Sequence, residues 1–211
     1  MQAETTPRQG ARKACFAAAT QSAVTVVKSS LELPTSVLSA KYLASGTRVK
    51  RLFAGLAAVK VYVVGFYLDV GAARGALSKH AGKPSDNLVS DAVALDVTKA
   101  LVIRLSRNVT SAQISDALVE RLEPLLGKAD EKALSAFKAA FVAGPPKLSR
   151  GAFVSLTLSK GGKCTVVVDG VAAAPIASRA LCTALQTVYL GSDPVVPSLK
   201  SDVAKALAQS L

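Results

Sequence analysis

The chain of 211 residues is 50% hydrophobic, which is enough to bury one sizeable core, so a single folded domain is expected. Lys60 interrupts the longest apolar stretch, and this excludes a membrane span of about eighteen apolar residues. The net charge of +12 comes without a block of about five like charges and with few aromatic residues, which argues against a nucleic-acid partner. Attraction to anionic ligands or lipid surfaces stays open.

The first 30 residues differ in composition from the rest of the chain. They are rich in Ala, Ser and Thr, carry several basic residues, and contain a single acid, Glu4. This composition is typical of an organelle transit peptide, although an ordinary disordered tail has the same character. We therefore expect a tail over residues 1–30 and one domain over 31–211. The expected location is a plastid, with the cytoplasm or the mitochondrion as alternatives.

Three strands are predicted in the first half of the chain. Residues 23–33 indicate a first strand that ends at Pro34. Residues 59–68 are apolar at odd and even positions alike, which predicts a central strand covered on both faces. Residues 101–106 alternate between an apolar set and a mixed set that contains Arg104 and Ser106, which predicts a half-buried strand.

Two helices follow. Thr110 or Ser111 can cap the first, and Gly127 lies just past its end, with Pro124 expected to bend or end it. Its apolar positions keep helical spacing: Ile114, Ala117, Leu118, Leu122 and Leu125. The second helix is predicted over residues 130–142, with Leu134, Phe137 and Phe141 as its buried stripe, and the sequence Gly-Pro-Pro at 144–146 stops it.

The last third of the chain predicts a hairpin and two helices. Strands over residues 152–158 and 163–168 meet at Gly161-Gly162, a hairpin signal. Helices are expected from Ser178 or Ala177 to about Tyr189, and over residues 198–210. Strands and helices are interspersed without a regular βαβ rhythm, so the predicted fold class is α+β, with helices layered on a largely antiparallel sheet.

The cysteines and the single histidine exclude several kinds of site. Cys15, Cys164 and Cys182 have no metal or redox spacing, and their odd number argues against a disulfide scaffold, so we expect small core residues. His80 lies in a Lys- and Gly-rich loop and is expected to be a solvated surface residue. No metal site, no cofactor and no histidine-based catalytic triad are therefore expected.

Arg48 is the first candidate for a ligand-binding residue. It follows a Gly46-Thr47 turn, and Tyr62 comes fourteen residues later on the apolar strand. A cation in a largely apolar setting requires an anion, because an unpaired buried charge is costly. Arg48 is therefore expected to hold an acidic ligand. For Tyr62, a core tyrosine whose hydroxyl reaches the surface or a backbone carbonyl is the alternative.

The stretch SGTRVKRLFAGLAAVKVYVVGFYLD, residues 45–69, resembles the signature of the chalcone isomerase superfamily. Three further blocks are similar to the same superfamily: LVIRLSRNVTSAQISDAL (101–118), VVVDG (166–170) and ALQTVYLG with DPVVPSLK (184–200). The resemblance covers roughly residues 33–205. It implies an open-faced β-sandwich, in which a large, mostly antiparallel sheet is covered by a layer of helices with a ligand cleft between them.

The resemblance implies five family positions for the enzymatic members, which close a chalcone to a flavanone. Arg48 and Thr187 keep the residue types of those enzymes. Tyr62 stands where they have a threonine, Ile114 where they have the catalytic tyrosine, and Arg121 where they have an asparagine. Because Ile114 has no hydroxyl, the enolate that develops during cyclisation loses a hydrogen-bond donor. No catalytic residue is therefore assigned.

The pair of Arg48 and Tyr62 resembles the non-catalytic, fatty-acid-binding branch, in which an arginine and a tyrosine clamp a carboxylate. We predict binding of fatty acids or similar apolar carboxylates by a monomer. The ligand-binding residues would be Arg48, Tyr62, Ile114 and Thr187. The alternatives are an isomerase of the intramolecular lyase type with an altered catalytic set, and an auxiliary protein that binds a polyketide product.

Overall fold

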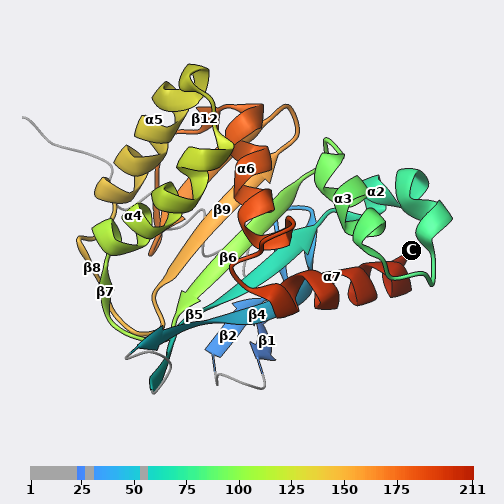
Figure 1. Cartoon of the computed structure of the whole chain (residues 1–211), viewed down its shortest axis with the longest axis horizontal. Coiled ribbons are helices and arrows are strands. Elements are labelled where there is room, and N and C mark those ends of the chain that lie inside the picture. The colour runs from blue at the N-terminus through green and yellow to red at the C-terminus, as the bar shows by residue number, and fades with distance from the viewer. Residues whose placement is uncertain (1–22, 27–30, 53–56) are drawn as a thin grey trace, which may run out of the picture.

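The structure, a computed structural model, describes residues 23–26, 31–52 and 57–211 (Figure 1). Within these residues, an eight-stranded sheet of antiparallel pairs forms the centre, in the order β11-β10-β9-β6-β5-β4-β3, with β12 also paired to β10. Its strands are β3 (Ser36–Val37), β4 (Ala40–Leu52), β5 (Ala57–Leu68), β6 (Lys99–Leu105), β9 (Phe153–Ser159), β10 (Lys163–Val168), β11 (Val171–Ala172) and β12 (Ile176–Ala177).

Helices cover one side of this sheet. Figure 1 shows α6 in front of β9, with α4 and α5 to one side of it, while α5 packs against β10 and α7 packs along β4. A large apolar cluster lies between the sheet and the helices. The helices are α2 (Val70–Leu77), α3 (Asp86–Ala94), α4 (Ser111–Leu122), α5 (Glu131–Val142), α6 (Arg179–Leu190) and α7 (Pro197–Ser210). Short turns of 3-10 helix are η2 (Ser78–His80), η3 (Glu123–Leu125) and η4 (Lys128–Asp130), and β7 (Val109–Thr110) pairs with β8 (Lys147–Leu148).

The predicted helices α4, α5, α6 and α7 are confirmed, and the bounds of α5, α6 and α7 lie within two residues of those expected. Helix α4 ends at Leu122, earlier than the predicted end just before Gly127. At the start of α4, the Thr110 hydroxyl accepts a hydrogen bond from the Gln113 backbone, and the Gln113 side chain accepts one from the Thr110 backbone. This reciprocal capping box satisfies two donors that the helix leaves unpaired. Pro124 lies in the short turn η3 that ends α4, as expected of a residue that cannot continue a helix.

Strand β5 is central and covered on both faces, as predicted. Val64 and Phe66 point into the cluster beneath the helices, while Val63 and Tyr67 belong to a second apolar cluster on the other face. Leu33 of β2 (Leu31–Pro34) helps to form that second cluster. Because successive side chains of a strand point to opposite faces, both clusters draw on the same strand.

Two strand predictions are wrong, and both involve strand β2. Residues 23–33 form two antiparallel strands, β1 (Ala23–Val26) and β2, rather than one. Because β2 covers the outer face of the sheet, Ala100 and Val102 of β6 are buried there, and β6 is not the half-buried strand that its alternation predicts. Most of the predicted tail, residues 1–22 and 27–30 with Cys15, lies outside the described residues. Cys164 and Cys182 are free and buried, as expected.

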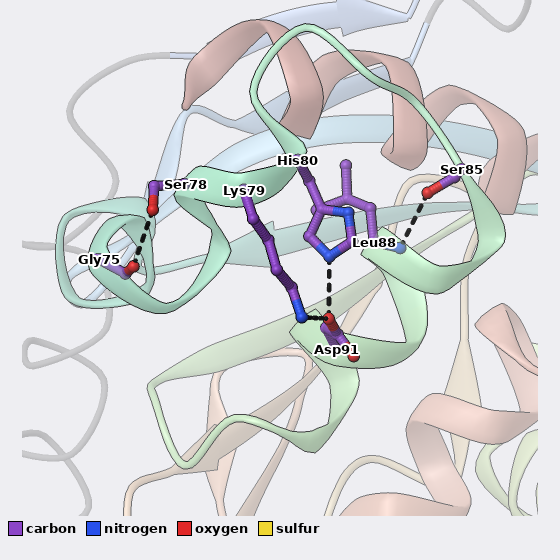
Figure 2. A network of polar contacts seen from close by, with 7 residues as sticks. All are labelled: Gly75, Ser78, Lys79, His80, Ser85, Leu88 and Asp91. Atoms are coloured by element: carbon purple, nitrogen blue, oxygen red, sulfur yellow. Dashed lines mark hydrogen bonds and ion pairs between the residues drawn. The ribbon is translucent and has the colours of Figure 1, made fainter.

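His80 is not the solvated residue that the sequence predicts. Its side chain is 14% exposed, and its Nε2 lies 2.9 Å from Asp91 Oδ2 on α3 (Figure 2). Lys79 Nζ lies 2.9 Å from the same carboxylate oxygen. The hydrogen bonds from Lys79 and His80 hold the pKa of Asp91 below its usual value. This network joins η2 to α3, two elements for which the sequence gives no prediction.

Lys99 closes the C-terminal end of α3. Lys99 is 2% exposed, and its ammonium donates hydrogen bonds to the carbonyl oxygens of Val93 at 2.7 Å and Leu95 at 2.6 Å. A cation at this position complements the carbonyl groups that a helix C-terminus leaves unpaired. Burial lowers the pKa of Lys99 from its ordinary 10.5 to about 8, because the charged form loses its hydration.

This shift predicts how Lys99 affects stability with pH. Above about pH 8, folded Lys99 releases its proton while the unfolded chain keeps it, so unfolding takes up a proton and stability rises with pH. Between about pH 8 and 9.5, the wild type should gain roughly 1–2 kcal/mol relative to Lys99→Met. The raised pKa values of Cys164 and Cys182 make stability fall as the pH rises. Both thiols are present in the wild type and in Lys99→Met, so the comparison of the two proteins isolates Lys99. Urea unfolding at several pH values checks this, and parallel stability curves would contradict it.

The Gly161-Gly162 turn joins β9 to β10, and both glycines have positive φ, 84° and 73°. A Cβ atom at Gly162 would lie 2.2 Å from Arg179 Cγ and 3.1 Å from Arg179 Cα, whereas one at Gly161 would meet nothing within 4 Å. Gly162→Ala should therefore lower the free energy of unfolding by about 2–3 kcal/mol, and Gly161→Ala by about 1 kcal/mol. Denaturant unfolding of the two variants compares them directly. Equal losses would mean that the contact with Arg179 does not constrain the turn.

Candidate functional site

The structure places Arg48 and Tyr62 side by side. Arg48 of β4 is the antiparallel partner of Tyr62 of β5, and a register shift follows directly between Arg48 and Val49. Both residues are partly buried, and the Tyr62 ring packs against the apolar cluster beneath the helices. A guanidinium and a phenol that come from neighbouring strands are therefore held at one place, at the edge of the core.

Tyr189 is a third member of this group that the sequence did not single out. It lies on α6 and is 0% exposed, and its hydroxyl oxygen is 3.2 Å from that of Tyr62. Burial raises the pKa of both tyrosines, and the charge of Arg48 offsets only part of this effect. Both phenols are therefore protonated at neutral pH and able to donate hydrogen bonds. The sequence feature that could have indicated a buried Tyr189 is its position four residues after Leu185 in the block ALQTVYLG, which places both on one face of a helix.

Arg48 has no acidic partner among the described residues. Its Nη1 donates to the carbonyl oxygen of Val195, 2.9 Å away, in the segment between α6 and α7. The ion pairs of the described part of the chain do not include Arg48. A neutral carbonyl does not balance a guanidinium charge, so the site carries an uncompensated positive charge beside two phenols.

Arg121 lies close enough for its charge to favour ionisation of Tyr62, although less than Arg48 does. Its Nη2 donates to Asp193, to the backbone oxygen at 3.0 Å and to Oδ2 at 2.9 Å. The Asp193 side chain is 89% exposed and that of Arg121 is 42% exposed, so solvent screens this ion pair. Unlike Arg48, Arg121 thus already has a carboxylate partner.

The remaining predicted residues offer no free polar group toward Arg48. Ile114 is 5% exposed and belongs to the apolar cluster. The Thr187 hydroxyl donates to the Thr183 carbonyl of its own helix at 3.0 Å, a common arrangement for threonine within helices. The structure therefore brings together Arg48, Tyr62 and Tyr189, with Arg121 nearby. It leaves Ile114 in the core and the Thr187 hydroxyl occupied.

Open pockets lie elsewhere in the described part of the molecule, and two of them are relevant here. One of about 920 Å³ lies between α5 and residues 172–180, and alanines form most of its lining. The other, of about 120 Å³, lies between the end of α3, β9 and α6 and has Lys99 among its lining residues. Neither is lined by Arg48 or Tyr62. The side chains behind Tyr62 are packed core residues, so a long ligand held by Arg48 would have to separate them.

The described residues contain no group of three or more His, Cys, Asp or Glu side chains that could hold a metal ion. Over the same residues, every helix is too short or too polar to cross a membrane.

Residues 44–203 match the model of a family described as chalcone isomerase-like. The chain is 33% identical over 174 residues to a chalcone–flavanone isomerase of Oryza sativa subsp. japonica, which spans 72% of this chain and 74% of that protein. It is also 23% identical over 188 residues to fatty-acid-binding protein 1 of Arabidopsis thaliana, over 83% of this chain and 67% of that protein.

The crystal structure of an Arabidopsis thaliana fatty-acid binding protein is similar in fold, with a TM-score of 0.78 at 20% sequence identity. The similarity covers 90% of this chain and 98% of the other. At this sequence identity the match is evidence for the fold alone. It confirms the predicted α+β open-faced β-sandwich, a large antiparallel sheet covered by a layer of helices.

Proposed function

This chain belongs to the chalcone isomerase-like family, and we propose that it binds a fatty acid or a similar apolar carboxylate without transforming it. One observation carries the proposal. The Arg48 guanidinium lies at the edge of the apolar core, lacks a carboxylate partner among the described residues, and neighbours two protonated phenols. The similarity to a protein named for fatty-acid binding supports the same conclusion.

The chemistry of the head group follows from Arg48 and Tyr62. A carboxylate can accept two parallel hydrogen bonds from a guanidinium, and the Tyr62 hydroxyl can supply a third. Arg48 Nη1 donates a hydrogen bond to the Val195 carbonyl, so a ligand carboxylate must replace this carbonyl as the acceptor. A carboxylate accepts a stronger, charge-assisted hydrogen bond than a backbone carbonyl does, which favours the exchange.

The acyl chain would enter the apolar cluster into which the Tyr62 ring packs. Ile114 and Leu118 of α4 belong to that cluster, together with Leu185 of α6. These helices must move apart from the sheet for the chain to enter. The substitution of the enzymes' tyrosine by Ile114 makes this environment more suitable for hydrocarbon, because a buried hydroxyl without a partner is costly.

The second candidate function is an intramolecular lyase, as in the rice relative that is 33% identical. Arg48 and Thr187 match the residue types expected of such an enzyme. However, the Thr187 hydroxyl is bonded to the Thr183 carbonyl, and Ile114 cannot donate a proton. The site therefore favours binding over cyclisation.

Mass spectrometry of the ligands that co-purify with the recombinant full chain tests the proposal without assuming a chain length. We expect apolar carboxylates in the wild type and their loss in Arg48→Met. Recovery of polyketide products in place of fatty acids would support the auxiliary-protein alternative. The absence of any apolar carboxylate from native protein would count against the proposal.

Tyr62→Phe should weaken fatty-acid binding about 3- to 10-fold, because it removes one hydrogen bond worth about 0.5–1.5 kcal/mol and retains the ring. Tyr42→Phe is the matched control. The Tyr42 hydroxyl donates to Ser45 at 3.0 Å, and its ring packs against the second apolar cluster on the other face of the sheet. Calorimetric titration with a fatty acid should show an unchanged affinity for Tyr42→Phe. If Tyr62→Phe also retains full affinity, Tyr62 does not contact the head group.

A further inference from the structure

One end of the sheet is strongly basic. Backbone contacts bring four segments together there, since Ser106 donates to the Val61 carbonyl at 2.9 Å and Gly151 donates to the Leu105 carbonyl at 2.8 Å. Figure 1 shows β7 and β8 at the left of the molecule, on the same side as this end of β4 and β5. Seven basic residues and no acidic residue occur in the four segments, which are 47–50, 58–62, 104–110 and 145–153.

The register of the strands places this charge beside the candidate site. Arg48 pairs with Tyr62, and Tyr62 pairs with Leu105. Lys50 comes two residues after Arg48, and Arg107 comes two residues after Leu105, and both are exposed. Two residues of a strand span about 7 Å, so the exposed charges lie one short step beyond the site.

Two further exposed basic residues, Lys147 and Arg150, are held at the same place. Lys147 of β8 pairs with Thr110 of β7, and the Arg150 backbone donates to Asn108 Oδ1 at 2.8 Å. In the described part of the chain, Lys50, Arg107, Lys147 and Arg150 take part in none of the ion pairs. These four residues are called the basic rim.

The carboxylates nearest to the basic rim do not neutralise it. Asp193 lies beside the candidate site, but Arg121 already pairs with it at 2.9 Å. Asp169 is farther along the sheet, where its backbone donates to the Phe153 carbonyl of β9 at 2.8 Å. At the opposite end of the molecule, ion pairs with basic residues involve Asp86, Asp91 and Asp96. Unpaired positive charge is therefore concentrated at the basic rim.

The basic rim is suited to an extended anionic surface. Neither of the two pockets described above is lined by its residues. Lys50 and Arg107 lie about two strand spacings apart, or about 10 Å, which is close to the Debye length at physiological salt, so their fields add. Val49, next to Lys50, is 39% exposed and offers an apolar contact. Lipid head groups with negative charge attract such separated Lys and Arg residues, and the interface below them accepts an apolar side chain.

We propose that the basic rim docks this protein onto a lipid surface that carries anionic head groups. Docking places the Arg48 site next to the bilayer, in which an apolar carboxylate dissolves. The exchange of such a ligand with the bilayer rests on the proposed function, whereas docking does not.

Co-sedimentation of the delipidated full chain with vesicles tests docking. We expect binding to vesicles of phosphatidylcholine mixed with phosphatidylserine, and little binding to phosphatidylcholine alone. The binding should weaken as salt is raised, because salt screens exposed charges. Equal binding to both kinds of vesicle would overturn the proposal.

A triple variant, Lys50→Gln with Arg107→Gln and Arg150→Gln, removes most of the charge of the basic rim. Its affinity for the anionic vesicles should fall by about fivefold per residue and roughly 100-fold in total. Wild-type affinity in this variant would overturn the proposal, since it would place the lipid contact elsewhere in the chain.

The matched control is a triple variant that removes the same net charge from exposed lysines away from the basic rim, namely Lys83→Gln, Lys128→Gln and Lys132→Gln. It should retain its affinity for anionic vesicles within about threefold. Equal losses in the two triple variants would show attraction by net charge alone and would overturn the proposal.

Two further measurements separate this proposal from its neighbours. The rim variant should keep its affinity for a dissolved fatty acid, so loss of docking and loss of the fatty-acid site are distinguishable. Poly-glutamate imitates an acidic protein and should compete with the vesicles only weakly. Tight binding of poly-glutamate together with no binding of anionic vesicles would assign the basic rim to an acidic protein and overturn the lipid proposal.

Discussion

Arg48→Met should weaken fatty-acid binding by about 2–5 kcal/mol, which is roughly 30- to 5,000-fold in the dissociation constant. Without the guanidinium, the ligand carboxylate would be desolvated at the edge of the core with no countercharge, and one phenol cannot replace it. Methionine retains the apolar stem of the side chain, so the packing between β4 and the Val195 segment should persist. Arg48 makes no ion pair among the described residues, and we therefore expect folding to remain intact.

Calorimetric titration of delipidated protein with a fatty acid measures this effect, and Arg121→Met is its control. Arg121 is also a guanidinium near Tyr62, but it is paired with the exposed Asp193. Its loss should change the affinity by about threefold at most, because exposed ion pairs contribute little. Equal losses in the two variants would mean that the fatty acid responds to the general positive charge of this surface and not to a specific contact with Arg48.

Chalcone cyclisation should not be accelerated appreciably by this protein. Ile114 is a core residue without a hydroxyl, and the Thr187 hydroxyl is bonded within α6. Loss of one donor that is preorganised for a developing oxyanion costs on the order of 10²- to 10³-fold in rate, or about 2.7–4 kcal/mol of barrier. The displacement of a second donor would add to this loss.

The assay follows the consumption of a hydroxychalcone by absorbance and separates the flavanone enantiomers. A chalcone–flavanone isomerase assayed in parallel serves as the positive control. We expect the spontaneous rate and a racemic product. Stereoselective turnover well above the spontaneous rate would instead assign catalysis to the retained Arg48 and the two phenols of Tyr62 and Tyr189.

The parts of the fold that could be predicted are those with strong local signals. The capping residue Thr110, the helical spacing from Ile114 to Leu122, and the glycine pair at 161–162 each fix an element through contacts close in sequence. The outer face of β6 could not be predicted in this way. Its burial depends on β2, which folds over the sheet from about 70 residues earlier in the chain, and periodicity within β6 carries no information about it.

The same distinction holds for the candidate site. The strand pairing of Arg48 with Tyr62 was not predicted, because the expected Gly46-Thr47 turn is wrong: both residues lie with Arg48 inside strand β4. The sequence linked Arg48 to Tyr62 only through the resemblance. Tyr189 reaches Tyr62 across 127 positions of sequence, through the packing of α6 on the sheet. The carbonyl that accepts a hydrogen bond from Arg48 belongs to the backbone of Val195. No side-chain type in the sequence could therefore have predicted this contact. The resemblance identified Arg48 and Tyr62, and the structure added Tyr189 and the Val195 carbonyl.

The central claim is that Arg48 selects a carboxylate at the edge of an apolar core. It is tested most directly by measuring the affinity of the delipidated wild type for a fatty acid and for the alcohol of the same chain length. We expect the acid to bind at least about 30-fold more tightly than the alcohol, and this preference to vanish in Arg48→Met. Equal affinity of the wild type for acid and alcohol, or binding of neither, would contradict the claim.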